Sequence, residues 1–420
     1  MKKIVSAVAL AAVAAGLATA ELNSSLNVRM GGSVFTKKMA DAGDTTNVLD
    51  LGSSDFGCDG LSFKASNDYA GVTLNWGASL QDKQKGGNQA TTFWTNNGKG
   101  IELSAWLKPA DFLKFQIGAH KDGIWTAEQC KKDTDDTSWS GAGKYAFLYK
   151  PGVQSKNNST GYFLDAMTDV LNGGQAYLYA DFSLMEGALS IRPTFVSTGV
   201  DFLQKKDKES DEAVMKTAPG AVVTFKNDAI KLNVDFQMPT NKDIAAGVYV
   251  SPLGLLDNAL QLMVGGTFST NTSSATDNLG YTGVARDTTF FAVDLRVRYV
   301  AGDFHIANAF NFTGASEDDV VVQGSGSAKT GDMHIWDAIF LTYKLNDNWT
   351  VTGDVQIDVI TGSGADDDAY LDLYVTPGVM YTCGKGATIT AGLHFDVADL
   401  SDNTAKTTTI SVPFVFRVKM

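Results

Sequence analysis

Cysteine, proline and histidine are scarce in this chain of 420 residues, which contains three Cys, eight Pro and four His. Three cysteines cannot form a framework of disulfide bonds, so such bridges do not hold the fold together. No H-x-x-x-H, C-x-x-C or G-x-S-x-G spacing occurs, and the common zinc, redox and esterase motifs are therefore missing. We expect no enzyme: no catalytic residues, no metal site and no cofactor.

A long apolar run is missing after the first twenty residues. The N-terminus reads Met-Lys-Lys, continues with an apolar stretch from Ile4 to Leu17, and ends in Ala18-Thr19-Ala20. This order of basic, apolar and small residues predicts a secretory signal peptide over residues 1–20, which is cleaved before Glu21. No later segment approaches the roughly 18 consecutive apolar residues of a spanning helix. Residues 21–420 are expected to form one domain without a transmembrane helix.

Positive charge is in deficit, with 34 Lys and Arg against 47 Asp and Glu. Removing Lys2 and Lys3 with the signal peptide takes the net charge from −13 to −15. Nothing basic is concentrated enough to attract nucleic acid, so no nucleic-acid partner is expected. The 42 Gly, with many Thr, Asn and Asp, suit strands that are joined by turns and polar loops.

Apolar and polar residues alternate along most of the remaining chain. From Trp349 to Val359 the odd positions are apolar apart from Gly353, while the even positions are Thr, Asp or Gln. From Ile230 to Met238 the even positions are apolar, and the same holds from Ile410 to Met420, the last residue. A period of two predicts strands with one oily and one wet face, because a helix would repeat every three or four residues.

The connections between these strands alternate between two kinds. Short turns are expected at 67–69, 108–111, 186–187, 227–228, 252–257, 301–302, 346–348 and 384–386. Long polar segments lie between them at 36–58, 81–99, 121–174, 197–218, 269–288 and 314–334, with shorter ones near 239–244, 361–369 and 398–406. This count gives eighteen strands. A further strand pair near 145–149 and 160–164 would raise the count to twenty.

A signal peptide, alternating strands, turns that alternate with long loops, and an amphipathic C-terminal strand together resemble a Gram-negative-type outer-membrane porin. The resemblance implies an all-β fold, a transmembrane antiparallel up-and-down β-barrel of about 18 strands (16–20), with periplasmic turns and extracellular loops. Such porins fold a long third loop with a short helix into the barrel, and Phe163, Met167 and Val170 have helical spacing within 121–174. The terminal Met420 and the ladder-breaking Pro413 depart from the usual pattern and indicate a divergent, spirochaete-like lineage.

A strand-based membrane protein must close on itself, so the apolar face of each strand meets lipid and the other face lines the lumen. Sixteen to eighteen strands leave an aqueous channel. The residues expected to line this pore are Arg29, Lys114, Arg192, Asp235, Asp294, Arg296, Arg298, Asp354, Asp358, Asp372, His394 and Asp396. Asp165 and Asp169 of the third long loop are expected at the constriction.

The cysteines give a prediction about sidedness. Cys58 closes the first long loop and Cys130 lies in the third, so any disulfide is expected to join these two residues outside the cell. Cys383 lies in a periplasmic turn, across the membrane from both. Three free thiols are the alternative.

The expected function is passive diffusion of small hydrophilic solutes and ions through a water-filled channel in the cell outer membrane. The expected partners are the lipid bilayer, these solutes and the outer-membrane assembly machinery, with a homo-oligomer left open. The rival interpretation is a surface adhesin or antigen, in which the barrel only anchors the extracellular loops. Long polar loops fit both interpretations, and the sequence names no solute.

Overall fold

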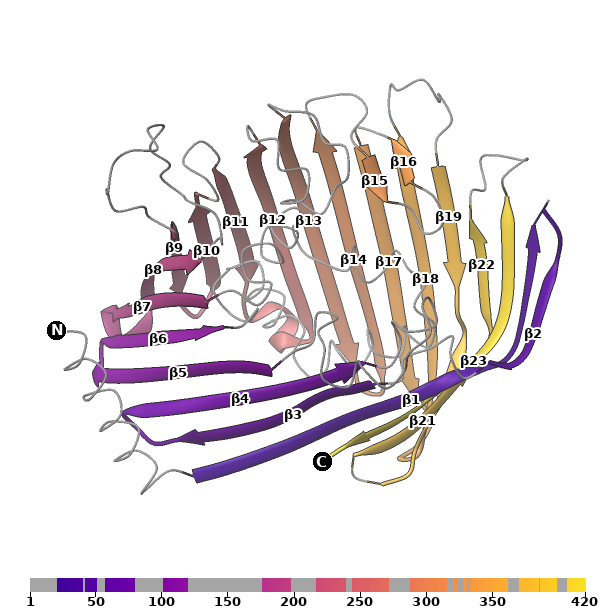
Figure 1. The fold of residues 1–420 in the computed structure, drawn as a ribbon, viewed down its shortest axis with the longest axis horizontal. Helices are drawn as coiled ribbons and strands as arrows, with labels where there is room; N and C mark the ends of the chain where they lie inside the picture. The colour runs from indigo at the N-terminus through magenta and orange to yellow at the C-terminus, as the bar shows by residue number, and fades with distance from the viewer. Residues whose placement is uncertain are drawn as a thin grey trace, which may run out of the picture.

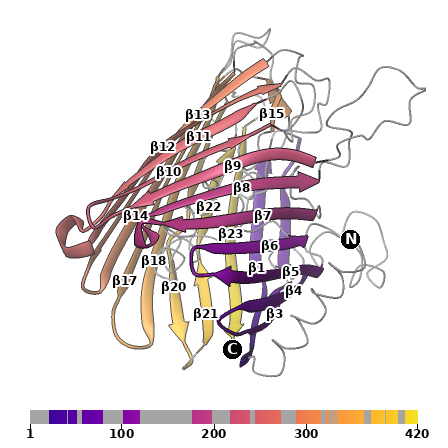
Figure 2. The same cartoon turned by 90° about the vertical axis from the view of Figure 1, so that its left-hand side faces the viewer.

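In a computed structural model of the chain, the fold is all-β and the strands follow one another in chain order around one antiparallel wall (Figures 1 and 2). The structure describes residues 21–40, 42–50, 57–79, 101–119, 176–197, 217–238, 244–271, 288–315, 321–323, 328–330, 333–361, 370–384, 386–398 and 406–420. Within these ranges no helix is long and apolar enough to cross a bilayer. Two short 3-10 helices, η4 (Met185–Gly187) and η5 (Leu255–Asn258), each lie in a turn.

Twenty-one strand segments build the wall. They are β1 (Glu21–Ala40), β2 (Thr45–Asp50), β3 (Gly57–Ser66), β4 (Ala70–Ser79), β5 (Ile101–Ala110), β6 (Leu113–Ala119), β7 (Ala176–Leu184), β8 (Leu189–Ser197), β9 (Thr217–Lys226), β10 (Ile230–Gln237), β11 (Ala245–Pro252), β12 (Leu260–Asn271), β13 (Thr288–Ala301), β14 (Phe304–Ala315), β17 (Met333–Lys344), β18 (Trp349–Thr361), β19 (Tyr370–Val375), β20 (Gly378–Thr382), β21 (Ala387–Gly392), β22 (His394–Ala398) and β23 (Thr407–Lys419). A separate hairpin pairs β15 (Val321–Gln323) with β16 (Ala328–Thr330).

Six of these segments join into three interrupted crossings, so the 21 segments make 18 passes through the wall. β2 and β3 follow one another along the same edge of β1. β19 and β20 share one edge of β18, on either side of Thr376 and Pro377. β21 and β22 both pair with β23 and are separated by Leu393. Eighteen is the number of strands that the alternation predicted.

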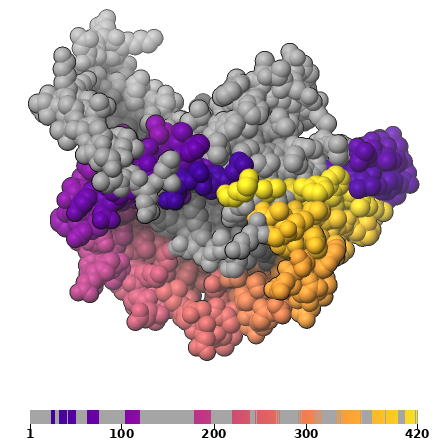
Figure 3. Space-filling view, turned by 90° about the horizontal axis from the view of Figure 1, so that it is seen from below, coloured from indigo at the N-terminus to yellow at the C-terminus, as the bar shows by residue number. Residues whose placement is uncertain are grey.

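The wall closes on itself through its first and last strands. β23 pairs with β1 over twelve residue pairs, from Asn27 opposite Lys419 to Ala40 opposite Thr407. Figure 3 shows the colours running around the molecule until yellow meets indigo again. β6 pairs directly with β7 over seven residue pairs, so no further strand stands between them. This pairing excludes the twenty-strand alternative, which needed an extra strand pair at that place.

The two faces of the wall differ in polarity, as the alternation predicted. On β18, Val355 and Ile357 are each 39% exposed, whereas Asp354 and Gln356 are 3% and 0% exposed. The same parity separates exposed apolar from buried polar side chains on β10, β13, β17 and β23. Because the wall is a closed ring, one face looks outward and the other inward. The exposed apolar face is the outer face, which is the arrangement that a bilayer requires.

Three of the short turns are closed in the same way. Asn67, Asn227 and Asn346 each accept hydrogen bonds through Oδ1 from the backbone N–H groups of the second and third residues after them, at 2.8–3.0 Å. The Asn side chain thus takes the place of a backbone carbonyl in the turn. In the third turn, Lys344 donates to Asp347 at 2.9 Å, and this hydrogen bond lowers the pKa of the Asp347 carboxyl.

The prediction of a long loop at 36–58 is wrong. β1 continues to Ala40 and forms a hairpin with β2, in which Phe35 lies opposite Val48 and Lys38 opposite Thr45. The Lys, Asp, Ser and Thr residues made this segment look like a polar loop, but pairing with β1 places Thr45 to Asp50 in a strand. Cys58 is accordingly the second residue of β3, within a strand rather than a loop. The β15–β16 hairpin likewise occupies part of the loop that was expected at 314–334.

Aromatic side chains gather at the end of the wall that carries the short turns. Tyr299, Tyr343 and Trp349 lie near the ends of β13, β17 and β18 and are 37%, 48% and 44% exposed. The ring of Trp349 packs against that of Tyr381 on β20, with 4.9 Å between the ring centroids. Such a band of exposed aromatic rings is typical of the boundary between hydrocarbon and water.

Candidate functional site: the inner face of the barrel

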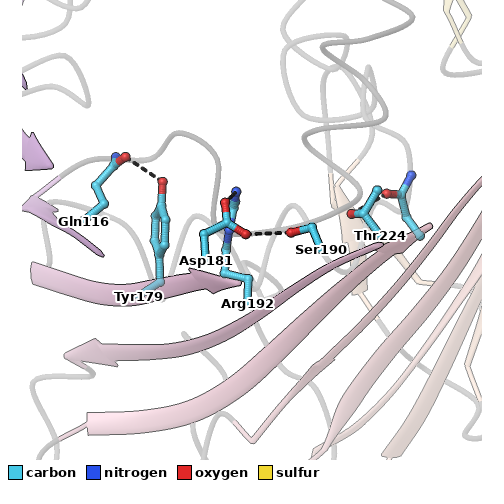
Figure 4. Close-up of polar contacts among 7 residues, drawn as sticks. Gln116, Tyr179, Asp181, Ser190, Arg192 and Thr224 are labelled. Atoms are coloured by element: carbon cyan, nitrogen blue, oxygen red, sulfur yellow. Dashed lines mark hydrogen bonds and ion pairs between the residues drawn. The ribbon is translucent and has the colours of Figure 1, made fainter. Parts of the chain in front are cut away.

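A row of hydrogen-bonded polar side chains follows the inner face from β6 to β10 (Figure 4). The Tyr179 hydroxyl of β7 donates to Oε1 of Gln116 on β6 at 2.6 Å. Further along, the Thr224 hydroxyl of β9 donates to Oδ1 of Asn233 on β10 at 2.9 Å. In each pair the two residues lie directly opposite one another on paired strands, so the β-sheet register alone brings each donor to its acceptor.

Arg192 is the charged centre of this row. Its guanidinium lies 2.6 Å from Oδ2 of Asp181, and the two side chains are only 11% and 20% exposed. The Ser190 hydroxyl donates to the other carboxylate oxygen of Asp181, also at 2.6 Å. The guanidinium stands over the ring of Tyr179 at 4.4 Å from the centroid, which adds a cation–π contact. Both ends of the ion pair are therefore held in place by neighbours on adjacent strands.

Lys114 and Trp106 extend the row in the other direction. Lys114 lies opposite Asp181 in the register, and its Nζ stands 5.0 Å from the centroid of the Trp106 ring. Trp106 lies flat across Gly71 of β4, where a Cβ atom would come within 2.3 Å of the indole nitrogen. Only glycine leaves room for the ring at this position. Together with Arg192, Lys114 gives this part of the wall two cations beside one carboxylate.

An acidic region occupies the inner face of β18, β19 and β22. Asp354, Asp372 and His394 are 3%, 0% and 1% exposed. Gln356 donates through Nε2 to both carboxylate oxygens of Asp354 at 3.0 and 2.8 Å. The Asp354 carboxylate is thus held by a neutral partner on its own strand, which offsets part of the cost of its burial.

Two further contacts hold this acidic region together. The Tyr374 hydroxyl donates to Oδ2 of Asp372 at 2.7 Å, and the Thr376 hydroxyl lies 2.8 Å from Nδ1 of His394. The rings of Tyr374 and His394 are stacked, with 6.3 Å between their centroids. The register continues the region, since Tyr374 lies opposite Asp396 and Asp372 lies opposite Asp358.

The acidic region and Arg192 stand on opposite sides of the ring. Counted from β1, β8 is the seventh of the 18 passes and the β19–β20 crossing is the sixteenth, so nine passes separate them in either direction. Arg296 and Arg298 share the inner face of β13, the twelfth pass, and are 6% and 5% exposed. Arg298 donates to Oε1 of Gln261 on β12 at 3.2 Å.

The other predicted site residues fall into three groups. Asp235 lies on the inner face of β10 and is 1% exposed, and Asp396 lies on β22. Arg29, Asp294 and Asp358 are placed by their backbone in β1, β13 and β18, and their side chains lie outside the described part of the structure. Residues outside the described ranges are Cys130, Asp165 and Asp169. Cys383 is an exposed free cysteine in the turn after β20.

Within the described residues, no group of three or more His, Cys, Asp or Glu side chains is placed to hold a metal ion. Sequence reasoning missed the aromatic and amide members of the inner face, above all Trp106, Tyr179 and Tyr374. They have the same parity as the charges on their strands, and this parity was the signal that could have found them. Aromatic residues on a wet face were overlooked because strands are rich in aromatics in general.

A closed antiparallel wall with an apolar outer face and a charged inner face defines a transmembrane β-barrel with the architecture of the outer-membrane porins. The structure is similar to a BenF-like porin from Pseudomonas fluorescens Pf-5, with a TM-score of 0.55 and 9% identity over 96% of this chain and 99% of the other. It is also similar to OpdL and OccK10 (OpdN) of Pseudomonas aeruginosa, with TM-scores of 0.52 and 0.51 and identities of 10% and 8%, over 95% of this chain and 99% of each of theirs.

No protein-family model matches the chain, and neither does any curated protein. The likeness therefore concerns the fold, and it confirms the predicted barrel class.

Proposed function

We propose that the protein is an outer-membrane channel through which small hydrophilic solutes and ions diffuse passively. The observation that carries the proposal is the opposite polarity of the two faces of an 18-pass closed wall. Eighteen strands enclose a lumen too wide for side chains to fill as a packed core. The charges on the inner face support a lumen that contains water, because an unpaired charge in a dry core costs on the order of several kcal/mol.

The inner face also suggests how ions would be sorted. Arg192 and Lys114 lie on one side of the ring, and the carboxylates of β18, β19 and β22 lie on the other side. Opposed walls of unlike charge create a transverse field, which orients solutes and separates the paths of cations and anions. We propose the charged residues of the inner face as pore-lining residues on this basis.

Two further parts of the proposal come from the sequence. We propose that residues 1–20 are a cleaved signal peptide and that the assembly machinery of the outer membrane inserts the barrel. We also propose that Asp165 and Asp169 bring negative charge to a constriction formed by the third loop. Changing both residues to Asn should then reduce the preference for cations, measured as a shift in reversal potential across a salt gradient.

Conductance in planar lipid bilayers tests the proposed function. Purified, refolded protein should give discrete steps of ion current, and liposomes that contain it should swell in small sugars. A folded barrel is recognised independently by its heat-modifiable mobility on gels. A barrel that is folded by this criterion and yet electrically silent would rule out the channel and favour the rival, an anchor for surface loops.

A further inference from the structure

Eight short turns form a rim at one end of the wall, and seven of them carry an acidic side chain. These carboxylates are all exposed on the protein surface: Asp68, Asp111, Glu186, Asp228, Asp257, Asp303 and Asp347. Lys108 and Lys344 pair with two of them, Asp111 and Asp347, at 2.9 Å each. Four others form neither a hydrogen bond nor an ion pair with any described side chain: Asp68, Glu186, Asp228 and Asp257.

Five of the same turns also expose a large apolar side chain next to the carboxylate or two residues from it. These side chains are 54–70% exposed: Tyr69, Phe112, Met185, Leu256 and Leu345. The five turns share no common sequence, so the combination recurs independently in each of them. Apolar groups favour removal from water, whereas carboxylates are costly in hydrocarbon. A layer that accepts both kinds of group is the environment that fits this rim.

The rim continues directly from the band of aromatic rings at the boundary between hydrocarbon and water. Asp303 lies four residues beyond Tyr299, and Asp347 lies two residues from Trp349. At about 3.3 Å per residue and a tilt of about 40°, two to four residues correspond to about 5–10 Å along the membrane normal. The polar layer on either side of the hydrocarbon core is about 5–8 Å thick. The turn side chains therefore lie in this layer or at its outer edge, at the depth of the lipid head groups.

Phospholipid head groups differ in what they offer to a carboxylate. The primary ammonium of phosphatidylethanolamine supplies both a positive charge and N–H donors, which together form charge-assisted hydrogen bonds. The quaternary ammonium of phosphatidylcholine has the charge but no N–H group. Phosphatidylglycerol has no cation, and its negative charge repels a carboxylate. The apolar side chains beside the carboxylates reach toward the acyl chains and strengthen the contact with any of these lipids.

We infer that the rim of short turns is a binding surface for phospholipids with a primary ammonium head group. The carboxylates of Asp68, Glu186, Asp228 and Asp257 bind the ammonium groups, and the apolar side chains of the rim insert beside them. The inference does not depend on the channel function, because an electrically silent barrel would carry the same rim.

Lipid retention in native mass spectrometry tests this preference. The protein in detergent micelles is mixed with equal amounts of phosphatidylethanolamine, phosphatidylcholine and phosphatidylglycerol that have identical acyl chains. It should retain phosphatidylethanolamine over phosphatidylcholine by about threefold or more, the factor that one exposed ion pair commonly contributes. Phosphatidylglycerol should be retained least. Equal retention of the three lipids would overturn the inference.

A charge-free variant then locates the preference on the rim. It combines Asp68→Asn, Glu186→Gln, Asp228→Asn and Asp257→Asn, and it should lose most of the preference. The matched charge-keeping variant combines Asp68→Glu, Glu186→Asp, Asp228→Glu and Asp257→Glu, and it should keep the preference. Asp44→Asn removes an exposed carboxylate from the β1–β2 hairpin at the opposite end of the barrel and should also keep it. Heat-modifiable mobility verifies that each variant is folded.

The remaining outcomes would contradict separate parts of the inference. A preference that survives in the charge-free variant would place the lipid site elsewhere on the barrel. A preference that is also lost in the charge-keeping variant would show that the shape of the turns, rather than their charge, selects the lipid. Tyr69→Ser with Met185→Ser and Leu256→Ser should lower the retention of all three lipids, and unchanged retention would remove the apolar side chains from the binding surface.

Discussion

Replacing Val355 by Arg is the most direct test of which face of the wall meets lipid. Val355 is 39% exposed and lies six residues from each end of β18. At about 3.3 Å per residue and a tilt of about 40°, six residues correspond to about 15 Å along the membrane normal. The side chain therefore lies near the middle of an apolar band that is about 25 Å tall. Its neighbours on the adjacent strands, Ile339 and Val375, offer no group that could pair with a guanidinium.

The expected loss of folding stability is about 2–4 kcal/mol, because an Arg at the midplane of the lipid face must enter hydrocarbon or distort the bilayer to reach water. Two variants on the same strand provide the comparison. Trp349 lies near the boundary with water, so placing the charge of an Arg there should cost only about 0–1 kcal/mol of folding stability. The loss of the ring contact with Tyr381 adds to this cost. Asp354→Asn on the inner face keeps an oxygen that can accept from Gln356 and should change stability far less than Val355→Arg.

Urea unfolding of the barrel in phospholipid vesicles, followed by tryptophan fluorescence, gives the free energies for this comparison. Leu393→Arg is a second test on another strand, since Leu393 is 39% exposed and the adjacent His394 is 1% exposed. Equal losses of stability at Val355 and Asp354 would show that the assignment of the two faces is wrong. An Arg at Val355 that costs no more than a Leu would show that this position does not meet hydrocarbon.

Three further predictions concern the lumen and the loops. Arg192→Gln removes the cation that pairs with the neighbouring carboxylate and should shift the reversal potential of the channel toward cations; an unchanged potential would place Arg192 away from the ion path. Deletion of residues 160–172 should raise single-channel conductance, and an unchanged value in a folded barrel would remove the third loop from the constriction. Mass mapping of any disulfide should find Cys58 joined to Cys130, whereas a bond to Cys383 would contradict the predicted sidedness of the barrel.

The sequence was sufficient for the class of fold and limited the number of strands to eighteen or twenty, and the pairing of β6 with β7 decided for eighteen. Alternation on a period of two is a local property, visible wherever a strand has one apolar face, and β18 and β23 display it almost without interruption. The prediction was wrong at 36–58, because strands that continue beyond the apolar part of the wall lack one oily face. Composition there resembles a loop, and only pairing with β1 identifies β2 as a strand.

The candidate site could be predicted as a set of residues but not as an arrangement. Parity assigned Arg192, Asp354 and His394 to the inner face, and the structure places all three there. That Arg192 reaches Asp181 depends on the register between β7 and β8, which is set by a turn and by pairing over the whole hairpin. A shift by one residue would move every side chain of a strand to the other face, and no single-strand pattern fixes this register.

Asn308 and Asp337 illustrate the same division. In the sequence, Asp337 merely interrupts the apolar positions between Met333 and Tyr343, and Asn308 interrupts those of its own strand. Seen alone, each is an isolated irregularity. Only the antiparallel pairing of β14 with β17 makes them hydrogen-bonded neighbours at 2.6 Å.

The sequence by itself determined that this protein forms many amphipathic strands and which side chains share a face, because these properties depend on neighbours along the chain. The tertiary structure decided which strands close the ring, which charges stand opposite one another, and which polar groups meet across strands. Those properties arise from contacts between residues far apart in sequence, such as Leu26 with Met420 across the β1–β23 junction. The first and last strands must pair, because lipid cannot form hydrogen bonds with the backbone groups at their edges. The register between the two strands determines which residues lie opposite one another.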